Sequence, residues 1–233
     1  MKKSKEEWKV YKNVFSESSR KNIFKLKSEG HFEELASPIS IGKEANIFSA
    51  RTKDGKMVVV KIYRLENCNF NKMFEYLATD PRYLSIKKNK RQIVFAWTQR
   101  EYKNLLLARE AVRVPTPITF KKNIVVMEMI GEPAPMLKDA IPEDPENFLR
   151  LVVKNFENMK KNEIIHGDLS EFNILNHEEK PVFIDFSQAT IKRSPNARDL
   201  YERDKKNIKR FFNKIMDEKA IEKVFEEFKK EVQ

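Results

Sequence analysis

Hydrophobic residues recur at helical spacing near the start of the chain. Between residues 4 and 28 they fall at steps close to three and four, which predicts one or two amphipathic helices with a basic outer face. The stripe consists of Trp8, Tyr11, Phe15, Ile23, Phe24 and Leu26. We interpret residues 1–35 as a helical segment that packs on the domain after it, and a solvated basic face is favoured over a dedicated RNA-binding helix.

Strand patterns follow this segment. Residues 47–51 and 57–63 are short and rich in β-branched side chains, and the connection between them contains Asp54 and Gly55, a pair that tolerates positive φ. This pattern predicts an antiparallel hairpin. Residues 124–127 read IVVM and predict a further buried strand.

The middle of the chain is less regular. Residues 66–91 lose clear periodicity and include a basic run at 87–91, so we interpret them as a partly mobile insertion, followed by a helix at 97–110. Near residue 130, Gly and Pro interrupt regular structure. We therefore expect one lobe at 36–130 and a second, largely helical lobe at 131–233, with helices near 145–161, 197–216 and 217–231.

Composition and charge add a candidate partner. The 233 residues are 40% hydrophobic and include 17 Phe, which is enough for a folded core in one domain or in two lobes. The formal net charge is +11, but residues 1–130 carry 27 Lys and Arg against 14 Asp and Glu, whereas residues 131–233 carry 19 against 21. A basic first half favours a polyanionic partner, and solubility alone is the alternative explanation.

Several classes of protein are disfavoured. The longest apolar run has five residues, 93–97, far fewer than a membrane-spanning helix requires, and no apolar stretch follows the charged start as a secretory signal would. We therefore expect a cytoplasmic protein with no membrane partner. The single cysteine, Cys68, and three histidines without metal-ligand spacing argue against structural zinc and against cysteine catalysis.

Two segments carry candidate chemistry. Residues 164–175 read IIHGDLSEFNIL and residues 182–187 read VFIDFS, which places Asp168, Asn173 and Asp185 beside apolar segments. Phosphoryl transfer needs a carboxylate that orients or deprotonates the acceptor, and oxygen ligands for Mg²⁺. Asp168 fits the first role, and Asn173 and Asp185 fit the second. Turn capping is the alternative, but it does not dictate this order or these apolar flanks.

A lysine in the predicted hairpin suggests a phosphate site. Lys61 lies at the centre of the strand at 57–63, and a buried ammonium requires anionic partners, which nucleotide phosphates and Glu101 of the next helix would supply. A solvent-facing lysine at a sheet edge is the alternative. Residues 40–47 read SIGKEANI and hold a single glycine, so phosphate contact there would depend on Ser40, Gly42 or Lys43.

With these residues aligned, the chain resembles the protein kinase superfamily and, within it, the Rio family of atypical serine/threonine protein kinases, type 1 branch, in an archaeal-like form. The similarity extends from about residue 10 to about residue 215. The motifs that carry it are IGKEAN at 41–46, DPR at 80–82, IVFAW at 93–97, MEMIG at 127–131, HGDLSEFN at 166–173 and IDFSQ at 184–188.

The resemblance implies a fold and site residues. The fold would be α+β and two-lobed, with a small antiparallel sheet and N-terminal helices in the first lobe and a trimmed, mainly helical second lobe. By resemblance Lys61 binds phosphate and pairs with Glu101, and Asp168 is the catalytic aspartate. Asn173 and Asp185 hold the metal, while backbone groups of Glu128 and Ile130 hold adenine. The implied cofactors are ATP and Mg²⁺, with Mn²⁺ as an alternative.

Departures from ordinary protein kinases are also informative. Gly167 stands where many kinases have the arginine that binds a phosphorylated activation loop, so that mode of control has no receptor here. After Asp185 there is no Ala-Pro-Glu element, so the peptide-docking half of a typical kinase is missing. Ile41, Phe172 and Phe186 differ from residues common in the type 1 pattern, but none removes a functional group.

The resemblance implies an ATP-hydrolysing factor in late maturation of the small ribosomal subunit, with self-phosphorylation, limited activity on other proteins, and a transient phospho-aspartate at Asp185. Its partners would be pre-small-subunit particles and rRNA. One alternative is a small-molecule phosphotransferase of the aminoglycoside or choline kinase type, which the loop at 42–45 and the basic insertion disfavour. Another is a non-catalytic RNA-binding scaffold, which the joint presence of Lys61, Asp168, Asn173 and Asp185 disfavours.

Overall fold

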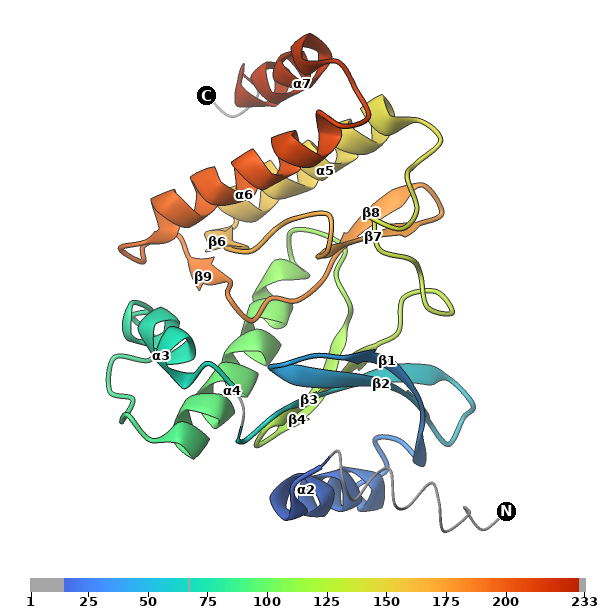
Figure 1. Ribbon diagram of the computed structural model, residues 1–233, viewed down its shortest axis with the longest axis vertical. Coiled ribbons are helices and arrows are strands. Elements are labelled where there is room, and N and C mark those ends of the chain that lie inside the picture. Colours follow the sequence, from blue (N-terminus) through green and yellow to red (C-terminus); the bar gives the residue numbers. More distant parts are fainter. Residues whose placement is uncertain (1–14, 67, 231–233) are drawn as a thin grey trace. The chain divides into compact units, whose positions relative to one another are not determined.

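The computed structural model describes residues 15–66 and 68–230, so the predicted helical residues Trp8 and Tyr11 lie outside the described part (Figure 1). The chain divides into two compact units. The first contains residues 1–77, 85–99 and 117–129, and the second contains residues 78–84, 100–116 and 130–233. The boundary expected near residue 130 thus separates most of the two units, but residues 78–84 and 100–116 cluster with the second.

The first unit is built on a five-stranded antiparallel sheet. Its strand order is β1-β2-β3-β5-β4, and helix α2 (Glu17–Ser28) lies against it. The strands are β1 (Glu34–Ile41), β2 (Ala45–Arg51), β3 (Met57–Tyr63), β4 (Pro117–Lys121) and β5 (Ile124–Glu128). The predicted hairpin is confirmed, since β2 and β3 pair in regular antiparallel register from Ala45 opposite Tyr63 to Arg51 opposite Met57.

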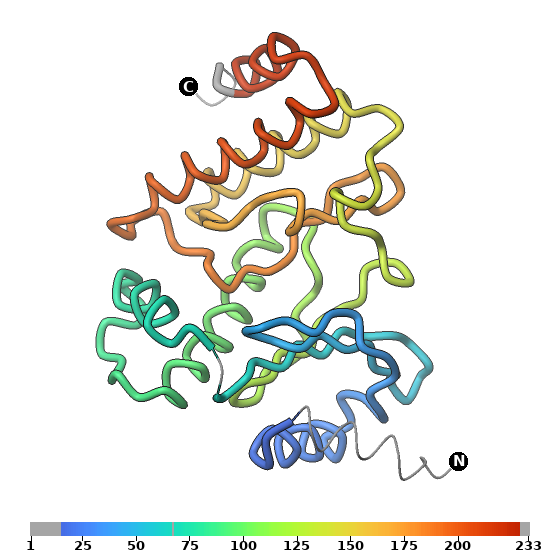
Figure 2. Tube along the Cα trace, viewed as in Figure 1, coloured from blue at the N-terminus to red at the C-terminus, as the bar shows by residue number. Residues whose placement is uncertain are grey.

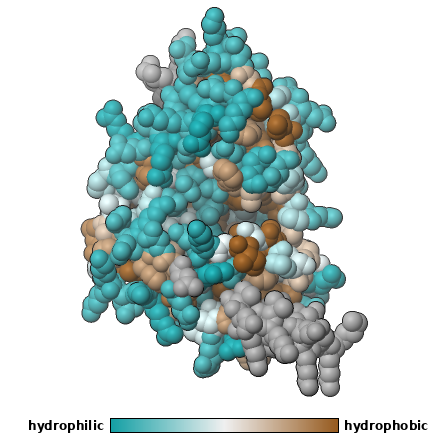
Figure 3. All heavy atoms as spheres, viewed as in Figure 1, coloured by the Kyte–Doolittle hydropathy of each residue, from teal (hydrophilic) through white to brown (hydrophobic). Residues whose placement is uncertain are grey.

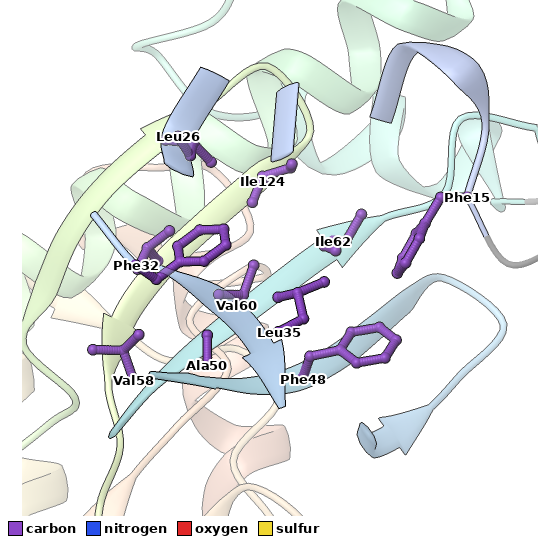
Figure 4. Packing of buried hydrophobic residues seen from close by; sticks show 11 residues of the cluster. Phe15, Leu26, Phe32, Leu35, Phe48, Ala50, Val58, Val60, Ile62 and Ile124 are labelled. Carbon is purple, nitrogen blue, oxygen red and sulfur yellow. The ribbon is translucent and has the colours of Figure 1, made fainter. Parts of the chain in front are cut away.

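One face of this sheet holds the hydrophobic core of the unit. In β3, alternate residues Val58, Val60 and Ile62 point to the same side, as the period of two in a strand requires. Figure 4 shows them with side chains from α2, β1, β2 and β5. The other buried members are Phe15, Leu26, Phe32, Leu35, Phe48, Ala50, Ile124 and Val126.

Helix α2 is capped and hydrogen-bonded to the sheet. The Ser16 hydroxyl accepts a hydrogen bond from Ser19 N at 3.2 Å, which satisfies one of the free N–H groups at the helix start. The fully buried Asn123 amide donates to Ser19 Oγ at 2.9 Å and to Tyr63 O at 2.7 Å, and its Oδ1 accepts from Asn22 at 3.1 Å. Asn123 therefore joins α2 to strand β3.

Two described helices follow β3 and precede β4 along the chain. The segment at 66–91, expected to be a partly mobile insertion, contains helix α3 (Phe70–Ala78), which buries Met73 and Leu77 one turn apart. Helix α4 (Lys90–Ala108) begins seven residues before the predicted helix start. Neighbouring Asn and Lys residues obscure the apolar spacing in this region, which is why the sequence pattern missed α3.

The second unit is mainly helical, as predicted. Its long helices are α5 (Pro145–Lys161), α6 (Ala197–Phe212) and α7 (Glu218–Lys230), and its short strands form two ribbons, β6 (Ile164–Ile165) with β9 (Thr190–Ile191) and β7 (Ile174–His177) with β8 (Lys180–Phe183). Figure 2 follows the path of these elements along the chain. Asp144 caps α5 by accepting from Asn147 N at 3.0 Å, and Phe156 stacks on Tyr201 of α6 at 4.6 Å.

The surface is largely polar. Hydrophilic side chains predominate on the face in Figure 3, where hydrophobic side chains form small separate patches. No helix in the described part of the chain is long and apolar enough to cross a membrane.

Candidate active site

Lys61 occupies a buried position in the middle of the first unit's sheet. It lies in β3, the central strand, with Ile47 of β2 and Val125 of β5 as its neighbours in register, and it is only 5% exposed. Its neighbours Val60 and Ile62 face the core with α2, so Lys61 points to the opposite face. The solvent-facing edge position that was the alternative is therefore ruled out.

The other predicted phosphate-loop residues lie at the end of β1 and in the turn that follows it. Ser40 of β1 is in register with Ile47, so Ser40, Ile47 and Lys61 form one row across three strands and share a sheet face. The turn between β1 and β2 is tight, because Gly42 N donates to Ala45 O at 3.0 Å and a Cβ on Gly42 would lie 3.0 Å from that same oxygen. Lys43 is exposed at the tip of this turn.

The predicted hinge residues lie at the end of β5 and just after it. Glu128 ends that strand opposite Val58. The Ile130 carbonyl accepts a hydrogen bond from Ala134 N at 2.7 Å. Glu101 is 1% exposed on α4 and belongs to the second unit, whereas Lys61 belongs to the first. The pairing of Lys61 with Glu101 stays a prediction.

The predicted catalytic loop begins after β6 with a buried histidine. His166 Nε2 lies 3.0 Å from Ile184 O, and its Nδ1 accepts from Asp168 N at 3.3 Å, so the tautomer with the proton on Nε2 satisfies both contacts. Ile184 N in turn donates to Asn173 O at 3.0 Å. The structure thus joins the loop that carries Asp168 and Asn173 to the segment that carries Asp185.

The donor atoms of these loops fit Mg²⁺. Asn173 Nδ2 donates to Asp168 O at 2.8 Å and lies 3.4 Å from Asp168 Oδ2, which leaves Asn173 Oδ1 as a ligand atom. Asp185 is half-buried, adopts a left-handed backbone with φ of 61°, and accepts a hydrogen bond from Ser187 N at 3.4 Å. An amide oxygen and a carboxylate are ligand types that Mg²⁺ prefers, so Asn173 Oδ1 and Asp185 would hold the ion together with phosphate oxygens and water.

The backbone explains why residue 167 is glycine. Gly167 has φ of 77°, and a Cβ there would lie 2.9 Å from Gln188 O and 3.3 Å from Leu200 Cδ1. The Gly167 carbonyl also accepts a hydrogen bond from the Arg203 guanidinium. The arginine that other kinases carry at this position therefore has no room in this loop.

We expect Gly167→Ala to lower the free energy of unfolding by about 3 kcal/mol, because it combines a left-handed alanine with a backbone clash. Gly55→Ala is the matched control, since Gly55 has φ of 84° and a Cβ there would meet no atom within 4 Å, and we expect it to cost about 1 kcal/mol. Urea unfolding measures both. Equal losses in the two variants would show that the contact with Gln188 has no cost.

A buried carboxylate on α6 holds both sides of Asp168. Asp204 accepts hydrogen bonds from Gly167 N at 2.7 Å and from Leu169 N at 2.8 Å, and its side chain is fully buried. Burial raises the pKa of Asp204 to about 7, and the two backbone N–H groups and Arg203 offset only part of that effect. Asp204 therefore holds the backbone of the predicted catalytic loop on both sides of Asp168.

Asp204 should make stability fall with rising pH. Its pKa of about 7 lies above the ordinary value of 3.8, so between these values the folded protein holds a proton that the unfolded chain has lost. The unaltered protein and Asp204→Asn are compared by the difference between their free energies of unfolding. We expect this difference to fall by about 2 kcal/mol from pH 5 to pH 7, because the unaltered protein alone loses the stabilising proton on Asp204. Urea unfolding across this range measures the difference, with Asp199→Asn as an exposed control on the same helix. A pH-independent difference would contradict the raised pKa.

Sequence reasoning missed Asp204, although the chain holds a signal for it. In α6 the residues Leu200, Asp204 and Ile208 are spaced by four, so a carboxylate occupies the middle of the buried stripe of an amphipathic helix. A charged side chain at a core position is rarely tolerated without partners.

Comparison with known proteins agrees with the fold. A family model described as a RIO domain matches residues 46–225. The RIO-type serine/threonine-protein kinase Rio1 of Haloferax volcanii is 38% identical over 91% of this chain and 74% of its own length. The human serine/threonine-protein kinase RIO1 is 32% identical over 90% of this chain, which covers 39% of the human protein.

Solved structures show the same fold. The Rio2 kinase from Chaetomium thermophilum superposes with a TM-score of 0.66 at 25% identity, covering 87% of this chain and 66% of that one. Its ADP/Mg²⁺-phosphoaspartate complex superposes with a TM-score of 0.65 at 24% identity, covering 83% and 59%. The predicted α+β, protein-kinase-like fold is confirmed.

The chain therefore belongs to the RIO family of serine/threonine protein kinases. Among its relatives, Rio1 kinases of archaea reach 37% to 39% identity, which confirms the predicted type 1, archaeal-like form. Kinase activity implies ATP and a divalent metal ion as cofactors.

Proposed function

We propose that this kinase hydrolyses ATP through a phospho-aspartate at Asp185 and acts in the late maturation of the small ribosomal subunit, in the cytoplasm. The observation that carries the catalytic part is the pair of joined loops, in which His166 and Asn173 bind the segment of Asp185. A non-catalytic scaffold would not need an aspartate, an amide and a second aspartate held together by backbone contacts.

Each residue has a separate proposed role. Lys61 neutralises phosphate charge from the buried sheet face, and Asp168 orients or deprotonates the acceptor. Asn173 Oδ1 and the Asp185 carboxylate hold Mg²⁺, or Mn²⁺ as an alternative. The metal ion neutralises charge on the transferring phosphoryl group when it is bound. Backbone groups of Glu128 and Ile130 hold adenine.

The phospho-aspartate pathway has two balanced steps. A carboxylate oxygen of Asp185 attacks the γ-phosphorus of ATP, the bond from that phosphorus to the β–γ bridging oxygen breaks, and ADP leaves. Water then attacks the acyl phosphate, which releases inorganic phosphate and restores the carboxylate. The sum is hydrolysis of ATP to ADP and phosphate. The Rio2 neighbour, whose structure contains ADP, Mg²⁺ and phosphoaspartate, supports this proposal for the family.

The test is a turnover and labelling assay with ATP labelled at the γ-phosphate, with and without small-subunit precursor particles. We expect phosphate release that the particles increase, together with protein-bound label that hydroxylamine removes. Label that is entirely stable to hydroxylamine would identify Ser or Thr phosphorylation and contradict the phospho-aspartate. Rapid phosphorylation of an aminoglycoside or of choline would favour the small-molecule alternative, and absence of turnover with particles would favour the scaffold.

A cluster of exposed cations supports rRNA as the partner. In the first unit, the first turn of α3, the segment before α4 and the start of α4 expose Lys72, Lys87, Lys88, Lys90 and Arg91. Lys88 Nζ lies 5.7 Å from the ring centre of Phe74, and Lys90 Nζ lies 5.3 Å from that of Phe70. Clustered cations bind nucleic acid phosphates by releasing counterions, which makes the affinity depend on salt.

This part of the proposal is tested by replacing Lys87, Lys88, Lys90 and Arg91 with glutamine. We expect the slope of log affinity against log salt for a small-subunit rRNA fragment to become shallower by about 3. The matched control replaces four exposed cations of the second unit, Lys180, Arg193, Lys219 and Lys223. Equal changes in both variants would indicate attraction by net charge alone and contradict a local rRNA surface.

A further inference from the structure

The second half of helix α4 carries two buried polar side chains whose role is not explained by packing. Arg100 and Asn104 are both fully buried and lie four residues apart, so they share one helix face. They belong to the second unit, together with residues 78–84 and the segment that follows Asp185. Long polar side chains are seldom fully buried unless they satisfy a specific set of partners.

Their partners are backbone carbonyls directly after Asp185. Asn104 Nδ2 donates to Phe186 O at 2.9 Å and to Ala189 O at 2.6 Å, which uses both of its hydrogens. Arg100 Nη2 donates to Gln188 O at 3.5 Å. Three carbonyls within four residues are thus held by one face of α4.

Asp80 lies behind Arg100. Its Oδ2 is 3.3 Å from Arg100 Nε and 2.6 Å from Arg82 Nη2, and its Oδ1 accepts from Arg82 N at 3.0 Å. Asp80 is fully buried. Burial alone would raise the pKa of Asp80, but the hydrogen bonds and charge of Arg82, with the charge of Arg100, outweigh it and lower that pKa. The ionised Asp80 carboxylate therefore holds the Arg100 guanidinium in place.

We propose that Asn104 and Arg100, the latter held by Asp80, are positioning residues that keep Asp185 in its left-handed conformation and so aim its carboxylate at the metal. This inference rests on the proposed role of Asp185 as a metal ligand. With φ of 61°, Asp185 occupies a conformation that is sparsely populated outside glycine and persists where the surroundings over-determine it.

The arrangement gives residues 80–82 a function that does not require contact with nucleotide. Loss of Asn104 would remove its hydrogen bonds to the carbonyls of Phe186 and Ala189 and leave Phe186 O with the weaker contact from Ala189 N at 3.2 Å, so the peptide planes after Asp185 would be held less firmly. Groups that orient metal ligands without touching the metal commonly change metal affinity tenfold to a hundredfold when they are removed. The expected defect is therefore in metal-dependent binding, and nucleotide binding without metal should be unaffected.

The experiment compares the unaltered protein with Asn104→Ala, Asp80→Asn and the control Asn176→Ala. Asn176 is a buried amide of the same unit that donates to Ala140 O at 3.3 Å and to Glu179 Oε1 at 3.1 Å, neither of which belongs to residues 185–189. Affinity for a fluorescent ADP analogue is measured in EDTA and across a MgCl₂ titration. Hydrogen–deuterium exchange of the peptide covering residues 185–189 reports directly on the loop.

We expect Asn104→Ala to raise the Mg²⁺ concentration for half-maximal enhancement of ADP binding about tenfold, with unchanged affinity in EDTA and faster exchange at 185–189. Asp80→Asn, which leaves the Asn104 contacts in place, should shift it about threefold in the same direction. Asn176→Ala should change neither quantity. If Asn104→Ala does not fold, Asp80→Asn is tested instead, by the Mg²⁺ dependence of ADP binding and by exchange at 185–189.

Two results would overturn the inference. One is an Asn104→Ala variant that resembles Asn176→Ala in both readouts. The other is an equal loss of ADP affinity in EDTA and in Mg²⁺, which would indicate a general structural role. If Mg²⁺ fails to enhance ADP binding even in the unaltered protein, the proposed metal role of Asp185 fails, and exchange at 185–189 alone then decides whether Asn104 and Asp80 hold the loop.

Discussion

Replacing Asp168 with asparagine is expected to lower the rate of phosphoryl transfer about 1000-fold while leaving the affinity for Mg–ATP within about threefold. The asparagine keeps the size of the side chain and can still accept from Asn173 Nδ2, which lies 3.4 Å from Asp168 Oδ2. It cannot take a proton from a hydroxyl acceptor or from the water that attacks the acyl phosphate. Turnover is measured by phosphate release, and affinity by equilibrium binding.

The matched control is Asp199→Asn, which removes an exposed carboxylate of the same unit on α6. We expect it to leave turnover unchanged. An Asp168→Asn protein that retains more than a tenth of normal turnover would contradict a role for Asp168 as the catalytic carboxylate.

Replacing Asp185 with asparagine should produce a different pattern. Asparagine adopts left-handed backbone as readily as aspartate, so the change removes the charge without new strain at φ of 61°. We expect the Mg²⁺-dependent part of ADP affinity to fall at least about tenfold and hydroxylamine-labile label to disappear. Binding in EDTA should stay within about twofold, because the metal ion is then absent from both proteins.

The two substitutions should differ in their effect on metal-dependent binding, so each is a control for the other. Asp168→Asn should retain Mg²⁺-dependent ADP binding, whereas Asp185→Asn should lose it. Equal loss of turnover and of metal-dependent binding in both variants, with unchanged unfolding curves, would contradict separate catalytic and metal roles.

The sequence predicted those helices and strands that short runs of neighbouring residues specify. The hairpin of β2 and β3 was predicted from two β-branched segments on either side of Asp54 and Gly55, and the helix expected near 145–161 is present as α5. The order of Asp168, Asn173 and Asp185 is the basis of the predicted site, because few functions other than nucleotide phosphoryl transfer require that order between apolar segments.

The supporting residues could not be predicted in the same way. Asp80, Asn104 and Asp204 are separated in sequence from the loops they hold, and an isolated Asp or Asn is equally typical of a cap or a solvated surface. Their roles depend on which carbonyl or N–H the folded chain brings to them. Asp204, for example, meets Gly167 N and Leu169 N across 35 to 37 residues of sequence.

The hydrophobic core that α2 covers decides where a recombinant fragment of this protein can begin. The family match begins at residue 46, yet β1 ends at Ile41 and α2 at Ser28, so both precede it. A fragment that starts at the match would turn β2 into an open edge and expose the inner face of the sheet. Asn123 would also lose its contacts with Ser19 and Asn22. The part of the chain that matches the family model is thus shorter than the part that forms the folded first unit. A recombinant fragment therefore needs to start before Phe15.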